Sequence, residues 1–196
     1  MIRFFMIIGV GTLLSAVLFI SNSEQFSAYA QEQKINSAPT NKHINGASGL
    51  PLPRFVSLKH NRAIVRSGPR RIYPQLWEYR RATLPLEIIE EYGRWRRVRD
   101  IQGDEGWMAA QLFSAKRYVI LRGTPTSHAL RRAPHFQAGI IAFVQADVIA
   151  KLLKCQNNWC ALSIKNKQGW LASDALWGLY DFEADDFEAD NFNADD

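Results

Sequence analysis

The sequence is poor in the residues that most often carry catalysis or bind metals. It has only two cysteines and four histidines, and the histidines are scattered along the chain. Gly-x-Ser-x-Gly, His-Glu-x-x-His and phosphate-binding glycine motifs are all missing. The neighbouring carboxylates Asp104 and Glu105 precede Gly106, where a turn explains them better than acid–base chemistry. We therefore predict a protein that is not an enzyme and that needs neither cofactor nor metal.

Helical patterns are missing as well. Beyond the N-terminal segment, no ten-residue stretch has apolar residues at a clean spacing of 3.6. Short apolar runs alternate instead with turns rich in glycine, which is typical of small β-barrels. We predict strands over residues 63–66, 86–91 and 95–101, with a turn at 102–104. The fold class is therefore all-β.

The N-terminal segment has the three-part pattern of a secretory signal peptide. Arg3 precedes an apolar run over residues 4–20, and a more polar stretch ends in Ala28-Tyr29-Ala30. The run is short for a membrane span, and no stop-transfer charge cluster follows it. We predict a signal peptide over residues 1–30, cleaved after Ala30, and a periplasmic or secreted protein. An uncleaved N-terminal anchor is the alternative, and membrane contact is expected only through it.

Charge is unevenly distributed along the remaining residues. Residues 31–180 carry 23 Lys and Arg against 10 Asp and Glu, whereas residues 181–196 hold eight acidic residues and no basic one. In this last segment Phe182, Phe187 and Phe192 recur every five residues, a period of neither helix nor strand. We predict an acidic disordered tail over residues 181–196. Residues 31–53, rich in Asn, Ser, Gly and Pro, are predicted to be a disordered spacer.

The body of the chain contains a degenerate internal repeat. Its markers in the first copy are Pro69, Trp95 and Trp107, and they match Pro134, Trp159 and Trp170 in the second, at separations of 65, 64 and 63 residues. Drift of one residue between markers is what small loop insertions produce. The repeat therefore predicts two similar domains in tandem.

The first copy resembles the bacterial SH3-like domains. The residues that carry the resemblance are Val65-Arg66-Ser67-Gly68-Pro69, Trp95-Arg96-Arg97-Val98, Gly106-Trp107 and Leu112. The second copy is more divergent, but Trp159-Cys160-Ala161-Leu162 and Gly169-Trp170 persist. The resemblance implies two tandem small SH3-like β-barrels, over residues 54–120 and 121–180, in an exported protein.

The two cysteines, Cys155 and Cys160, flank a predicted hairpin turn. Neighbouring thiols are normally oxidised in the periplasm, so we predict a disulfide. A redox pair would favour Cys-x-x-Cys spacing, and a zinc site would need two further ligands. The repeat places Glu91 and Arg96 at the equivalent positions. We predict that both pairs join the same hairpin, one covalently and the other by charge.

Candidate ligand-binding residues lie in the long connection at residues 70–81, which interleaves arginines with aromatic residues. The resemblance implies that this connection borders a ligand groove. The candidates are Tyr73, Trp77, Tyr79, Arg80 and Arg81, joined by Arg94 and Trp95 from the following hairpin. Such a surface could stack on rings and bind carboxylates. The alternative is that Tyr73 and Trp77 plug the open end of the barrel.

The remaining tryptophans are assigned from strand alternation. Trp95 and Trp159 lie three residues before Val98 and Leu162, and an odd separation places two residues on opposite faces of a strand. We therefore expect these two tryptophans to lie at least partly outside the core. The tryptophans of the two Gly-Trp pairs, at positions 107 and 170, are expected inside or between the barrels.

We predict a non-enzymatic envelope binding or adaptor protein that recognises cell-wall peptide or an extended protein segment through the first barrel. Export argues against a nucleic-acid partner for the cationic body. A self-assembling structural envelope protein and an unrecognised cell-wall hydrolase are the alternatives from other classes. The acidic tail could dock on the first barrel or on a neighbouring subunit, or it could be a solubilising end that does not dock.

Overall fold

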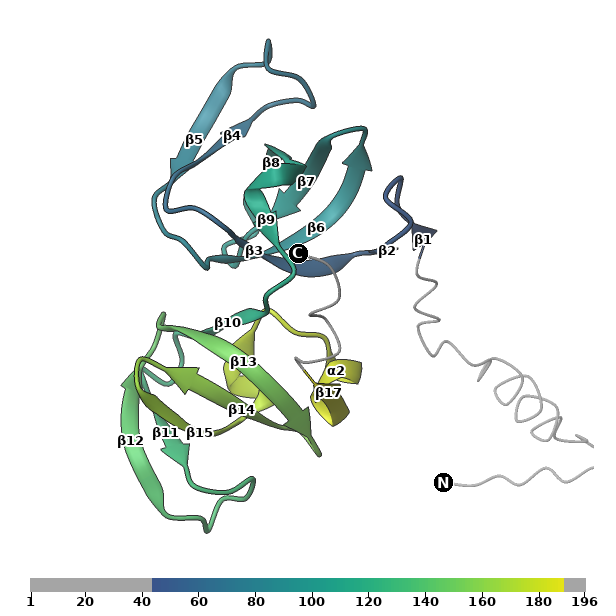
Figure 1. Ribbon diagram of the computed structural model, residues 1–196. Coiled ribbons are helices and arrows are strands. Elements are labelled where there is room, and N and C mark those ends of the chain that lie inside the picture. The colour runs from purple at the N-terminus through teal and green to yellow at the C-terminus, as the bar shows by residue number, and fades with distance from the viewer. Residues whose placement is uncertain (1–43, 189–196) are drawn as a thin grey trace, which may run out of the picture. The chain divides into compact units, whose positions relative to one another are not determined.

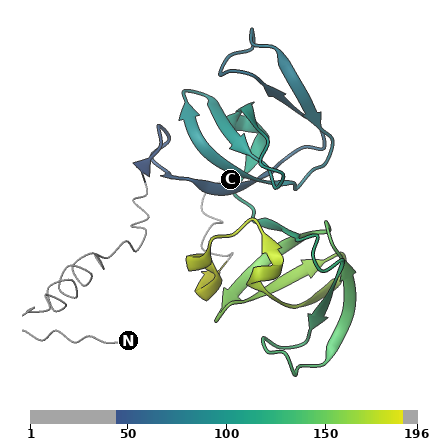
Figure 2. The ribbon, with the colours of Figure 1, turned by 180° about the vertical axis from the view of Figure 1, so that it is seen from behind.

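The computed structural model describes residues 44–188, which are nearly all β (Figures 1 and 2). An N-terminal hairpin is formed by β1 (Ile44–Asn45) and β2 (Pro51–Leu52). The first barrel consists of β3 (Arg54–Leu58), β4 (Ala63–Arg66), β5 (Gln75–Tyr79), β6 (Pro85–Tyr92), β7 (Trp95–Arg99), β8 (Glu105–Ala109), the 3₁₀ helix η1 (Ala110–Leu112) and β9 (Phe113–Ser114).

The second barrel repeats these elements and adds two. It consists of β10 (Tyr118–Leu121), β11 (Ser127–Arg131), β12 (Ile140–Gln145), β13 (Ile149–Gln156), β14 (Trp159–Ile164), β15 (Lys167–Ala172), η2 (Ser173–Ala175) and β16 (Leu176–Trp177). The helix α2 (Asp181–Asp185) and the strand β17 (Asp186–Glu188) follow. The predicted signal peptide lies outside the described residues, and within them no helix is long and apolar enough to cross a membrane.

The two barrels have the same topology. Strand order is β5-β4-β8-β7-β6-β3-β9 in the first sheet and β12-β11-β15-β14-β13-β10-β16 in the second. Even the irregularities repeat, because the register shifts between Ile88 and Glu90 in one barrel and between Leu152 and Lys154 in the other. The predicted all-β fold of two tandem SH3-like barrels is confirmed.

Each barrel encloses its own apolar core. The first core is built from Val56, Leu58, Ala63, Val65, Leu86, Ile88, Val98, Met108 and Phe113. The second is built from Val119, Leu121, Ala150, Leu152, Cys155, Cys160, Leu162, Leu171, Leu176 and Phe187. Each set is drawn mainly from alternate positions of short strands, as expected for strands with one face buried.

The Gly-Trp pairs are oriented opposite to the prediction. Gly106 and Gly169 are buried, and the tryptophans that follow them lie on the outer face, half-buried. A Cβ at Gly106 would overlap a methyl group of Val65, and one at Gly169 would lie 2.8 Å from a backbone oxygen of β11. The glycine thus allows two strands to approach closely, and alternation then turns the next side chain outward.

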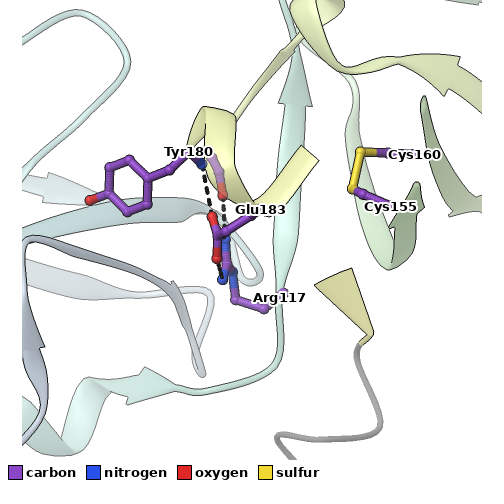
Figure 3. The surroundings of a disulfide bond; sticks show 6 residues. Arg117, Cys155, Cys160, Tyr180 and Glu183 are labelled. Carbon is purple, nitrogen blue, oxygen red and sulfur yellow. Dashed lines mark hydrogen bonds and ion pairs between the residues drawn. A yellow bond between two sulfur atoms is a disulfide. The ribbon is translucent and has the colours of Figure 1, made fainter. Parts of the chain in front are cut away.

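The prediction for the two hairpins is confirmed. Cys155 and Cys160 are paired in register and joined by a disulfide, with 4.0 Å between their Cα atoms (Figure 3). Glu91 and Arg96 are paired at the equivalent position of the first barrel, with Arg96 Nε 3.0 Å from Glu91 Oε1. No cluster of three or more metal-ligating side chains occurs within residues 44–188.

The end of the predicted spacer is ordered rather than disordered. Residues 44–52 form the N-terminal hairpin, in which Gly46 N–H donates to the carbonyl of Leu50 at 2.8 Å. The hairpin covers the Glu91 carboxylate, which accepts hydrogen bonds from Ser48 N–H at 2.6 Å and from Arg54 at 2.5 Å. A buried carboxylate requires such donors, and supplying them orders the segment.

The described part of the predicted tail is ordered as well, and its strand pairs with the second barrel, while Phe182 and Glu183 also line a pocket beside Phe55 of the first. Strand β17 pairs with β13, and Phe187 is buried in the second core. The guanidinium of Arg117 forms an ion pair of 2.5 Å with the Glu183 carboxylate of α2. Figure 3 shows this pair. The position of residues 181–188 is therefore set by the pairing of β17 with β13 and by the burial of Phe187. The prediction relied instead on attraction between the acidic tail and the basic first barrel. Phe192 lies outside the described residues.

Candidate ligand-binding groove

A groove on the first barrel lies between the β4–β5 connection, the β6–β7 turn and η1. We call it the first groove, and it consists of two adjoining cavities of about 630 and 290 Å³ that share Arg71, Trp95 and Ala109. The larger cavity is lined by Arg70, Arg71, Arg94, Trp95, Ala109, Ala110 and Gln111. A hydrogen bond of 2.9 Å from Ala110 N–H to the carbonyl of Arg94 fixes η1 beside the turn.

The charge of the first groove is positive and unbalanced. Among residues 44–188, no carboxylate lies within ion-pair distance of Arg70, Arg71 or Arg94. On the smaller cavity, by contrast, Arg62 forms an ion pair with Glu78, whose pKa is held below its ordinary value by the hydrogen bond from Arg62. The three unpaired guanidinium groups can bind carboxylates, while the half-buried Trp95 offers an aromatic surface.

Two of the predicted ligand-binding residues, Arg94 and Trp95, line this groove. Trp77 and Tyr79 lie on β5 and pack partly buried against the first core, with ring centroids 6.1 Å apart. The hydroxyl of Tyr79 donates to Asp100 Oδ2 at 2.7 Å, and burial, reinforced by this bond, raises the pKa of Tyr79.

The other predicted residues also lie elsewhere. The ring of Tyr73 covers Gly68, leaving no room there for a Cβ atom. Arg80 forms an ion pair with Glu78 at 3.0 Å, and Arg81 donates to the carbonyl of Asp147 at 3.3 Å. The segment 70–81 was expected to be a loop, but it contains β5, which pairs with β4 and so keeps its aromatic residues against the barrel.

The residues contributed by the end of β8 and by η1 were missed by sequence reasoning. Ala109 of β8 and Ala110 and Gln111 of η1 follow Gly106-Trp107-Met108 and carry no charge or aromatic group that would single them out. Leu112, which belongs to the motif, lies at the end of η1 and could have located this wall of the groove.

The model of the bacterial SH3 domain matches residues 59–114 and 124–178 of this chain. The chain belongs to the bacterial SH3 domain family. Bacterial SH3 domains are binding modules. None of the curated proteins matches the chain.

Among solved structures, the chain is similar to two proteins from Trichomonas vaginalis and one from Bacillus cereus. NlpC2 of T. vaginalis is 14% identical with a TM-score of 0.29, over 64% of this chain and 48% of that one. NlpC1 of T. vaginalis is 13% identical with a TM-score of 0.29, over 63% and 45%. The NlpC/P60 family protein of B. cereus is 12% identical with a TM-score of 0.29, over 63% and 55%. This chain thus spans about half the length of these proteins.

The second SH3 domain has a groove at the equivalent place, but the chain itself covers it. This second groove, of about 390 Å³, is lined by Phe136, Trp159, residues 172–174 of β15 and η2, and Asp181 and Ala184 of α2. Phe136 packs edge-on against Trp159 with ring centroids 4.8 Å apart. Trp159 is 9% exposed and therefore buried, contrary to the prediction that it would lie partly outside.

The repeat shows which residues close the second groove. Phe136 and Asn158 stand where the first SH3 domain has Arg71 and Arg94. Asn157 and Asn158 have φ of +49° and +61°, and their N–H groups donate to the carbonyls of Asp185 and Ala184 in α2. Helix α2 thereby obtains partners for carbonyls at its C-terminal end, which a short helix otherwise leaves to water.

Proposed function

We propose that the protein is a non-enzymatic binding or adaptor protein of the cell envelope, which recognises cell-wall peptide or an extended protein segment through the first groove. One observation carries the proposal: Arg70, Arg71 and Arg94 surround Trp95 without carboxylate partners among the described residues. Wall peptides carry free carboxylates and extended backbone, which guanidinium groups and an indole face can bind.

Two further features support this function. Membership in a family of binding modules favours recognition over catalysis. The disulfide Cys155–Cys160 favours an extracellular or envelope location, since disulfides persist in oxidising compartments. Export through the signal peptide of residues 1–30 is part of the proposal.

The test is retention of the full-length protein on purified peptidoglycan sacculi at low and moderate salt. The informative variant is Arg71→Phe/Arg94→Asn, because both new residues occur at these positions in the second SH3 domain and the fold accommodates them there. We expect the wild type to be retained at low salt, less so at moderate salt, and the variant to lose retention at both.

Trp107→Ala is the matched control, since this tryptophan is also half-buried but does not line the groove. Equal retention of wild type and Arg71→Phe/Arg94→Asn would contradict the proposed groove. Absence of any retention would contradict the wall ligand and direct the search to crosslinked protein partners.

A further inference from the structure

A separate cavity of about 620 Å³ lies over strands β13, β14 and β15 of the second SH3 domain. It shares no lining residue with either groove. We call it the outer cavity. Its lining includes the cationic residues Lys116, Arg117, Arg132, Lys151 and Lys154, together with Gln168, Trp170 and Glu188.

Most of the positive charge in the outer cavity is unpaired. Within residues 44–188, no carboxylate lies within ion-pair distance of Lys116, Arg132, Lys151 or Lys154. Arg117 forms an ion pair with Glu183, and Glu188 contributes one negative charge to the lining. The cavity therefore concentrates positive charge in a hollow, which raises the local concentration of anions.

An aromatic surface lies among these charges. Trp170 is half-buried, and the ammonium of Lys154 lies 5.6 Å from the centroid of its ring. The indole can therefore cover an apolar or ring-shaped part of a ligand whose charged group is held by the neighbouring lysines.

The same face of the first SH3 domain shows that the fold does not require this charge. There a ladder of five residues, Glu87, Glu90, Arg97, Arg99 and Glu105, forms ion pairs between 2.7 and 3.4 Å long. At the same register positions the second domain has Lys151, Lys154, Ala161, Ser163 and Gln168. Two carboxylate positions of the ladder are lysines here, and the other three ladder positions are uncharged, so Glu188 of β17 is the one carboxylate that the described residues place in the lining.

A charged strand face is commonly just solvated, and the ladder of the first SH3 domain has that character. The outer cavity differs because four of its cations, Lys116, Arg132, Lys151 and Lys154, lie around a tryptophan in a hollow and have no carboxylate partner among the described residues. Its volume falls in the range of small-ligand sites.

We infer that the outer cavity binds a phosphate-bearing ligand, with the phosphate held by Lys151, Lys154 and Lys116 and the adjoining apolar or ring part lying on Trp170. Lysine ammonium groups bind phosphate as point charges, and three of them line this cavity. The amide of Gln168 supplies an uncharged hydrogen-bond donor in the same lining. This inference does not depend on the function proposed for the first groove.

Two sources could present such a phosphate, a phospholipid head group in a membrane or a soluble phosphorylated compound. The full-length protein should be tested in two arms. One measures sedimentation with phosphatidylcholine vesicles with and without phosphatidylglycerol, and the other measures calorimetric binding of glucose 6-phosphate and inorganic phosphate. Binding only to the anionic vesicles identifies a membrane head group, and binding of the sugar phosphate identifies a soluble ligand.

The deciding variant is Lys151→Glu/Lys154→Glu, which introduces the residues of the first SH3 domain at the same positions. Lys165→Glu/Lys167→Glu is the matched control, because it makes the same change of charge at exposed positions that do not line the cavity. We expect the first variant to weaken binding by about tenfold or more and the control to change it much less. Equal weakening by both variants would overturn the inference, as would absence of binding in both arms.

Discussion

The two SH3 domains share one topology and differ in where each leaves positive charge unpaired. In the first domain Arg70, Arg71 and Arg94 are unpaired in the groove among the described residues, and the outer face carries a ladder of ion pairs with three carboxylates and two guanidinium groups. In the second domain the groove is covered by Phe136 and α2, and a cluster of cations without carboxylate partners among the described residues, Lys116, Arg132, Lys151 and Lys154, lines the outer cavity. A duplicated scaffold can thus present different faces to ligands while its strand pairing stays the same.

The two domains also differ in what secures the end of the central hairpin. A disulfide joins β13 to β14, and β17 adds a strand beside it. At the equivalent position of the first domain lies the buried Glu91 carboxylate. It is bound by Arg54 of β3, by Arg96 of β7 and by Ser48 of the N-terminal hairpin. In each case a segment outside the repeat completes the domain, the N-terminal hairpin in the first and β17 in the second. If the charge cluster and the disulfide are equivalent, removing either should destabilise its own domain by a similar amount.

The largest effect is expected at Phe187, which anchors the tail segment in the second core at 5% exposure. Phe187→Ala should lower the free energy of unfolding of the second domain by about 3 kcal/mol, since it removes a buried aromatic side chain. Urea denaturation followed by the indole N–H resonances of Trp107 and Trp170 separates the two domains. Phe182→Ala, at a residue that is 51% exposed, is the control and should cost much less.

Glu91→Ala should have the next largest effect and should act on the first domain. It leaves Arg54 and Arg96, whose side chains are only 16% and 11% exposed, without their carboxylate. Because both arginines keep some exposure to solvent, the loss should cost about 2–3 kcal/mol, less than for a fully buried pair. The Trp107 resonance should report the loss while the Trp170 resonance does not. Equal destabilisation of both domains would show that they unfold as one unit.

Sequence patterns predicted the features that repeat. The strand at residues 63–66, the two hairpins, the disulfide and the equivalent charge pair follow from the spacing of tryptophans and from the offset of 64 residues. Trp95 could be placed beside a groove because it belongs to the motif, and Arg94 because it precedes Trp95 in the same hairpin. The order of the tail could not be predicted, since the β-pairing of Asp186-Phe187-Glu188 arises only from contact with a distant strand and burial of one ring.

The mistaken placements have a common physical cause. The Gly-Trp tryptophans were assigned inward because large apolar residues favour the core, whereas close strand approach required the glycine there and alternation turned the indole outward. Trp77 and Tyr79 were placed beside the groove because the resemblance implies that their connection borders it, but pairing of β5 with β4 holds them against the barrel, which is closer to the alternative in which Trp77 closes the barrel. Both outcomes depend on contacts between strands that are distant in the sequence.

The double variant Cys155→Ser/Cys160→Ser should destabilise the second domain by about 2 kcal/mol, because the disulfide closes only a short loop in the unfolded chain. Urea denaturation by the Trp170 resonance measures the effect, and the wild type under reducing conditions should reproduce it. Unchanged stability would mean that the pairing of β17 with β13 already secures this hairpin, and the comparison with Glu91 would then fail.

The smallest effect, and the one that separates charge from covalent bonding, is the response to acid. Burial raises the pKa of Glu91, but hydrogen bonds from Arg54 and Ser48 outweigh it and hold the pKa below the ordinary value of 4.5. The stabilisation is therefore present above about pH 4.5 and is lost as the pH falls through the lower pKa of the folded state. The loss should be smaller than that in Glu91→Ala, since a protonated carboxyl still fills the site and accepts hydrogen bonds.

Between pH 6 and pH 3 the urea midpoint of the Trp107 resonance should fall more than that of Trp170, because the disulfide does not titrate. Glu91→Gln should reduce this difference between the two midpoints. An equal fall of both midpoints in the wild type would show that the ion pairs of Glu91 with Arg54 and Arg96 contribute no pH dependence to the stability of the first domain.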